Sequence, residues 1–153
     1  MRYVSDAGSI EDLRAAETEL GVSFPDDYSA FIVSSGRVDR DFGGSWLMLY
    51  GVEELAPLNR SYDHSERYPG LVLFGSDGGG EGVGFDFRSN PPRIVLVNYV
   101  SAGWHEAIVQ ADTFTDFMAQ RDAARATSSR SSAPYLPLGR YLPSTIGERI
   151  TTA

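Results

Sequence analysis

The residues with the clearest chemical potential lie in a glycine-rich segment, residues 74–82, where five of the nine residues are Gly. Bare backbone amides in such a segment can bind phosphate. This one lacks the Gly-Lys-Ser/Thr ending of a nucleotide-binding loop, and Asp77 and Glu81 would repel an anion. Those two acids alone do not provide the ligand series of a calcium loop. We therefore interpret the segment as a β-hairpin turn in which several glycines adopt positive φ.

Acid–base catalysis is the second chemistry to consider. His105 and Glu106 are adjacent, but the other histidine, His64, is 41 positions upstream, and no His-Glu-x-x-His or Gly-x-Ser-x-Gly motif occurs. A pair of carboxylates could act as in glycosidases, although the sequence selects no such pair. An enzyme using acids near the glycine-rich segment stays an alternative, and a deep pocket lined by paired acids would favour it. Our prediction is that the protein has no catalytic residues, cofactor or metal site.

Helices are predicted towards both ends of the chain. The first covers residues 9–20, with Ser9 as its N-cap and Gly21 as its left-handed stop. The second begins at Pro25, which suits a first turn, and ends near residue 35. A short helix is predicted at residues 51–59, and a last amphipathic helix follows Thr113 and includes Phe114, Phe117 and Met118.

Strands are predicted in the middle of the chain. The apolar or alternating segments are residues 46–50, 71–75, 83–88 and 94–99. Residues 37–45 and 60–69 are polar and predict exposed loops, whereas residues 104–108 fit either a short strand or the entry to a helix. This order predicts an α+β fold with a mostly antiparallel central sheet flanked by helices.

Charge divides the chain into two parts. Its 153 residues carry a net charge of −8, but residues 1–119 hold 19 acids and eight arginines, a net of −11. Residues 120–153 have a net of +3 and are rich in Ser and Pro. We predict one domain over residues 1–125 and a basic tail or arm over residues 126–153, with a Ser-rich linker at residues 127–132. An acidic domain disfavours nucleic acid and favours a basic partner.

Composition also limits the environment. The chain has no Cys, which excludes disulfides, thiolate metal sites and a cysteine nucleophile. No signal-peptide pattern is visible at the start, and the apolar runs are far shorter than the roughly 18 residues of a membrane helix. We expect a cytoplasmic protein with no membrane contact, and the sequence leaves its oligomeric state open.

The two tryptophans have different contexts. Trp46 begins an apolar run, so we expect it in the core. Trp104 follows a turn and precedes charged residues, and it fits a packed residue or an interface anchor equally well.

Two blocks of residues form a pattern along the chain. The first is Ala16-Glu17-x-x-Leu20-Gly21-x-x-Phe24-Pro25-x-Asp27-Tyr28-x-x-Phe31, and the second runs from Leu73 to Asp86 through the glycine-rich segment. Together they resemble the SMI1/KNR4 (SUKH) family over about residues 9–119. The family has an α+β domain without shared catalytic residues. Its bacterial members are mostly immunity proteins that bind and block a cognate toxin, often a nuclease, whereas its fungal members are cell-wall and signalling regulators.

The resemblance implies an immunity protein of a polymorphic toxin system, with a basic toxin as its partner. The alternative is a scaffold or regulatory module without a toxin. An acidic surface could occupy the basic site with which a nuclease holds phosphates. We expect the partner to contact acids in loops and one aromatic anchor: Asp39, Asp41, Asp63, Glu66, Asp77, Glu81 and Trp104.

Overall fold

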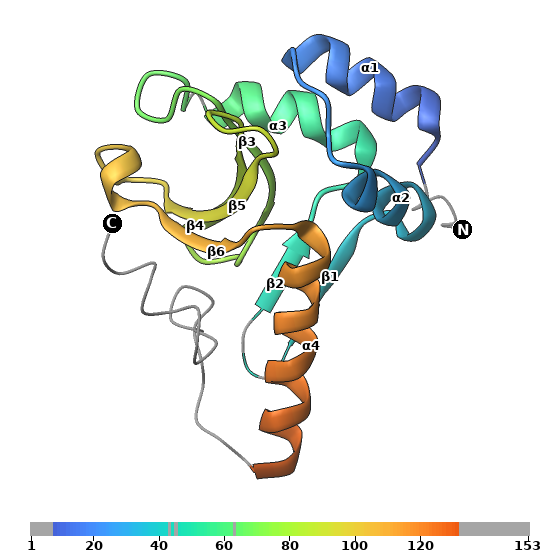
Figure 1. The fold of residues 1–153 in the computed structure, drawn as a ribbon, viewed down its shortest axis with the longest axis vertical. Coiled ribbons are helices and arrows are strands. Elements are labelled where there is room, and N and C mark those ends of the chain that lie inside the picture. The colour runs from blue at the N-terminus through green and yellow to red at the C-terminus, as the bar shows by residue number, and fades with distance from the viewer. Residues whose placement is uncertain (1–7, 43, 45, 63, 132–153) are drawn as a thin grey trace.

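The computed structural model of the chain describes residues 8–42, 44, 46–62 and 64–131, without the side chains of 124–131. Its helices are α1 (Ile10–Leu20), α2 (Asp26–Ser35), α3 (Leu55–Tyr62) and α4 (Phe114–Ser131), with short 3₁₀ helices η2 (Val52–Glu54) and η3 (Trp104–Glu106). Its strands are β1 (Val38–Asp41), β2 (Trp46–Leu49), β3 (Leu71–Ser76), β4 (Glu81–Asp86), β5 (Arg93–Asn98) and β6 (Ile108–Ala111). All neighbouring strands pair antiparallel in the order β1 to β6, which confirms the predicted α+β fold. Figure 1 shows β3 to β6 strongly curved, with α1 and α3 at the top of the view.

The end signals of α1 act as predicted. Ser9 Oγ accepts a hydrogen bond from the Asp12 amide at 3.0 Å, and the Gly21 amide donates to the Glu17 carbonyl at 2.8 Å. The buried Glu17 side chain accepts the Phe24 amide at 2.7 Å, which ties the end of α1 to the segment entering α2. Local sequence signals therefore fix where the first helix begins, ends and turns back.

An aromatic cluster joins the helices to the sheet. The Tyr28 ring of α2 lies 5.3 Å, centre to centre, from the rings of Phe74 in β3, Phe85 in β4 and Phe114 in α4. These side chains are buried, and the pairs are tilted or edge-to-face, as aromatic quadrupoles favour. Burying each such ring stabilises the fold by about 1.5–3 kcal/mol.

The last helix is longer than the sequence predicts. Thr113 Oγ1 caps it by accepting the Asp116 amide at 3.0 Å, and Asp27 of α2 accepts both the amide and the hydroxyl of Thr115 at 2.9 Å. The helix continues to Ser131, through most of the stretch predicted as a linker. Figure 1 shows it extending well beyond the sheet. The division of the chain near residue 125 stays a prediction.

Strand β1 corrects the prediction of a loop at residues 37–45. Its sequence, Val-Asp-Arg-Asp, has little apolar character, and its side chains are exposed or half-buried. Because β1 is an edge strand, its pairing with β2 needs no buried face. Charged side chains on such an edge also oppose unwanted strand pairing.

Candidate functional site

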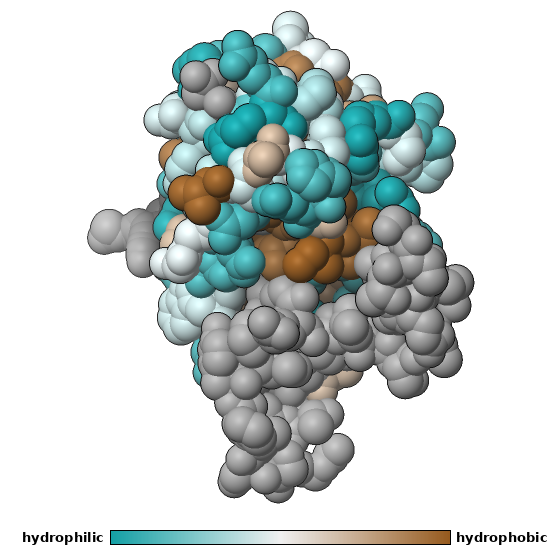
Figure 2. Space-filling view, turned by 90° about the vertical axis from the view of Figure 1, so that its left-hand side faces the viewer, coloured by the Kyte–Doolittle hydropathy of each residue, from teal (hydrophilic) through white to brown (hydrophobic). Residues whose placement is uncertain are grey.

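The structure places the predicted acids in two regions. Asp39 and Asp41 are exposed on β1, and Asp77 and Glu81 flank the β3–β4 turn at the same end of the sheet. Glu66 is exposed in the segment before β3, which contacts residues 99–104 through Arg67 and Pro69. Asp63 lies outside the described residues. Figure 2 shows that the described surface on one side is mostly hydrophilic, with hydrophobic residues gathered near its middle.

The glycine-rich segment is a hairpin turn, as predicted. Gly78 and Gly80 have φ of 82° and 118°, values that glycine adopts without strain. Asp77 Oδ1 accepts the amides of Gly79 at 2.8 Å and Glu81 at 3.1 Å. The Asp77 carboxylate thus already accepts the backbone amides of Gly79 and Glu81, which a bound phosphate would need as donors. This geometry favours a rigid surface turn over an anion site.

Trp46 is not in the core, and that prediction was wrong. Its side chain is 43% exposed, whereas Leu47 and Leu49 on the opposite face of β2 are buried. In the β1–β2 register, Trp46 lies opposite Asp41, and Met48 lies opposite Asp39. The apolar run therefore alternates inward and outward rather than being buried throughout. A Cβ on Gly78 would lie 3.5 Å from Cδ1 of Trp46, so the glycine turn lies near the indole, with room for about one side-chain carbon between them.

The neighbouring charges are partly held within the molecule. Arg37 Nη1 donates to both carboxylate oxygens of Glu54, at 2.6 and 2.8 Å. The other terminal nitrogen of Arg37, Nη2, lies 4.0 Å from Oδ2 of Asp39. Asp41 Oδ1 accepts the Gly44 amide at 2.7 Å. The Trp46 face of the β1–β2 hairpin consequently presents an indole beside the Asp41 carboxylate, while Asp39 on the same face lies close to Arg37.

Trp104 has a different environment. Its Nε1 donates to the Pro69 carbonyl at 2.9 Å, its ring meets Tyr68 edge-on at 5.3 Å, and the Arg88 guanidinium lies 3.8 Å from its ring centre. Arg88 in turn donates two hydrogen bonds to Asp86 at 2.9 Å. These contacts hold the half-buried indole in place, and its role as an anchor for a partner stays a prediction.

Asp86 is the buried acid of this network. Burial alone would raise the pKa of its carboxyl, but the hydrogen bonds from the Arg88 side chain and amide and the charges of Arg88 and Arg93 outweigh it and lower the pKa below its ordinary value. Asp86 therefore stays ionised and fixes Arg88 against Trp104. No sequence motif indicated this three-residue arrangement.

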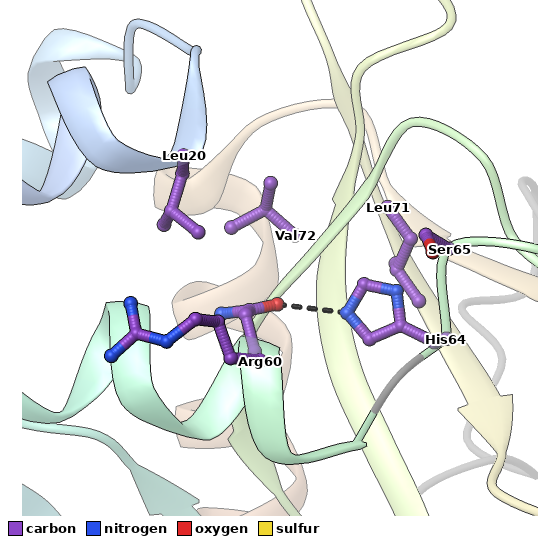
Figure 3. A pocket seen from close by; sticks show the side chains of 7 residues that line it. Leu20, Arg60, His64, Ser65, Leu71 and Val72 are labelled. Carbon is purple, nitrogen blue, oxygen red and sulfur yellow. Dashed lines mark hydrogen bonds between the residues drawn. The ribbon is translucent and has the colours of Figure 1, made fainter.

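Two cavities flank His64. The larger, about 460 Å³, is open and lies between α1, α3 and β3, with His64 and Arg60 among its lining residues (Figure 3). The dashed line in Figure 3 marks the 3.0 Å hydrogen bond between His64 Nε2 and Asn59 Oδ1. Because that oxygen also accepts the amide of Leu73, it is an acceptor, and Nε2 carries the proton.

The smaller cavity, about 120 Å³, has a mixed lining in which the aromatic side chains of Tyr62 and Tyr99 lie with polar ones, among them Arg67 and Asn98. The two tyrosine rings are stacked, with their centres 4.7 Å apart. Tyr50 lies beside them, and its pKa is raised mainly by burial and to a smaller extent by Tyr99 and Tyr62. The described lining residues of both cavities include no carboxylate. Within the described part of the chain, moreover, no group of three or more His, Asp or Glu side chains could hold a metal ion. The cavities thus give no support to acid-pair catalysis.

Residues 8–120 match the model of the SMI1 / KNR4 family (SUKH-1). The chain belongs to this family. SUKH-1 proteins are commonly immunity proteins in polymorphic toxin systems and are generally non-catalytic. A search of curated proteins found no match. No helix in the described ranges is both long enough and apolar enough to span a membrane.

Proposed function

We propose that this SUKH-1 chain is an immunity protein, which binds a cognate polymorphic toxin and blocks it through an acidic surface. The observation that carries the proposal is the family match over residues 8–120, a region with a net charge of −11. A nuclease or another toxin that binds phosphates needs basic residues at its active site. An acidic inhibitor is attracted to such a site over long range and can cover it.

The proposal includes the partner and the place of action. The partner is a basic protein toxin, not a nucleic acid, because phosphates would be repelled by the same charge. Protection from a nuclease is needed where the nucleic acid is, so we place the action in the cytoplasm. The acids in loops and on β1, together with Trp104, are the contacts we expect: Asp39, Asp41, Asp63, Glu66, Asp77 and Glu81.

An immunity protein of this kind predicts that the gene immediately upstream encodes the toxin, and co-expression with the toxin domain of that gene tests this function. The wild-type chain should restore growth to cells that express the domain. Charge-removing pairs at Asp39/Asp41, Asp63/Glu66 and Asp77/Glu81 should identify the acids that protection needs. The variant E11Q/E53Q removes two exposed charges outside this set and serves as the matched control. Absence of protection by the wild-type chain would instead favour a scaffold or regulatory module without a toxin partner.

A further inference from the structure

The β1–β2 hairpin presents one unusual outward face. Its register places Trp46 opposite Asp41 and Met48 opposite Asp39, so the four side chains share that face. Side chains directly opposite each other in an antiparallel pair have Cβ atoms about 4.5–5.5 Å apart. The Asp41 carboxylate and the indole are therefore near neighbours on the surface.

The indole has a second structural neighbour as well. The turn at Gly78 lies near its Cδ1 edge, where a Cβ on Gly78 would be 3.5 Å away, and that turn is fixed by the hydrogen bonds of Asp77. Leu47 and Leu49, fully buried on the reverse face, anchor the strand that carries Trp46. A surface built this way loses little conformational freedom when a partner binds.

The molecule already contains the complete form of this arrangement elsewhere. Asp86, Arg88 and Trp104 form a carboxylate–guanidinium–indole stack, with the guanidinium 2.9 Å from the carboxylate and 3.8 Å from the ring centre. Asp41 and Trp46 supply the carboxylate and the indole of such a stack. Among the described residues, no arginine is stacked on the Trp46 ring.

We infer that Trp46, Asp41 and Asp39 form an arginine-accepting patch, in which an arginine of the partner stacks on the indole and pairs with the carboxylates. The inference rests on the proposed function and names the surface that performs it. Arginine is the side chain that combines aromatic stacking with paired hydrogen bonds to a carboxylate. Among the described residues Asp41 forms no ion pair, whereas Asp39 lies 4.0 Å from Arg37, which is also bound by Glu54. The charge of Asp41 beside the indole therefore complements an arginine of a basic toxin.

Binding measurements on the upstream-encoded toxin domain test the patch. W46A should weaken the complex by about 30-fold or more, as expected of a central aromatic contact. D39N/D41N should weaken it by about tenfold, mainly through faster dissociation. I10A, which truncates an apolar side chain of equal exposure on α1, and E11Q/E53Q are the matched controls and should stay within about threefold. Urea unfolding of each variant verifies that it folds.

Fluorine NMR gives an independent readout on the unmutated chain. Labelling with 5-fluorotryptophan produces two signals, since the chain has two tryptophans, and W46F assigns them. Addition of the unlabelled toxin domain should shift or broaden the Trp46 signal strongly. If the wild type binds but W46A binds within threefold and the Trp46 signal is unchanged, the patch is wrong and the proposed function stands. If the wild type does not bind, the proposed function fails and the patch fails with it.

Discussion

The side-chain amide of Asn59 pairs with the backbone of Leu73 as a neighbouring strand would. Asn59 Oδ1 accepts the Leu73 amide at 2.8 Å, and Asn59 Nδ2 donates to the Leu73 carbonyl at 2.9 Å. Strand β2 pairs with β3 only through Met48 and Leu49, so at Leu73 the edge of β3 that faces away from β4 has no strand partner. A buried backbone amide and carbonyl that lack partners are costly, and Asn59 provides both.

Replacing Asn59 by Ala should therefore destabilise the protein by about 2–4 kcal/mol, because both Leu73 groups lose their partner inside the fold. Urea unfolding measures the free energy of unfolding directly. Asn98→Ala is the control, since Asn98 is exposed and its side chain accepts only a loop amide, that of Val100, at 2.9 Å in the structure. A loss at Asn59 no larger than at Asn98 would contradict the role assigned to it.

Asp86 should make stability depend on acid pH. Its pKa is lowered in the folded protein, so its contribution is present above the unfolded-state pKa of about 3.9 and is lost as the pH falls through the folded-state pKa. Asp86→Asn should cost about 1–2 kcal/mol at neutral pH, discounted because Arg88 is half exposed. The free energies of unfolding of the two proteins should begin to converge as the pH falls below about 4 and should meet below the folded-state pKa of Asp86. A constant difference across that range would show that ionisation of Asp86 is not the cause.

Gly84 should tolerate no side chain. A Cβ there would lie 2.6 Å from the Val72 carbonyl oxygen and 3.1 Å from Leu73 Cα, and backbone atoms of a paired strand cannot yield easily. Gly84→Ala should destabilise the fold by about 2–3 kcal/mol through overpacking. Gly79→Ala is matched to it in the same hairpin, where the nearest atom is 3.8 Å away, and should change stability by less than about 0.5 kcal/mol. Equal effects would count against the close approach of β3 and β4.

Association with the toxin domain should depend on salt. The net charge of −11 over residues 8–120 attracts a basic partner over distances that salt screens. Raising the ionic strength from roughly 0.05 M to roughly 0.5 M should slow association by about tenfold or more, with a smaller change in dissociation. Stopped-flow or surface-based kinetics can measure both rates. An association rate that salt does not change would argue against an acidic docking surface.

Much of the fold is predictable because its signals are local. Ser9 and Gly21 cap the two ends of α1 and so fix its bounds. The glycines between β3 and β4 predict a hairpin turn, because several of them adopt positive φ. Strand β1 was not predicted, because an edge strand does not need alternating apolar and polar residues and its sequence shows no such pattern. The pairing of Asn59 with Leu73 joins positions 14 residues apart, and no residue type marks it in advance.

The candidate surface was harder to predict than the fold. Trp46 in an apolar run resembles a core residue, and only the strand register shows that alternate members of the run face outward. The same register brings Asp41 beside it, whereas the glycine turn near the indole comes from Gly78, 32 positions further along the chain. The acids at this end of the sheet were candidates from the sequence, and their role stays a prediction; the exposed indole beside Asp41 was not among the candidates.

Titration of the purified chain into the purified upstream-encoded toxin domain, followed by calorimetry and by assay of the toxin, measures inhibition by binding directly. An immunity protein should form a stable complex with a Kd of about 1 nM or tighter, near −12 kcal/mol or below, with a parallel loss of toxin activity. No detectable heat and full toxin activity with the chain in large excess would contradict the proposed function.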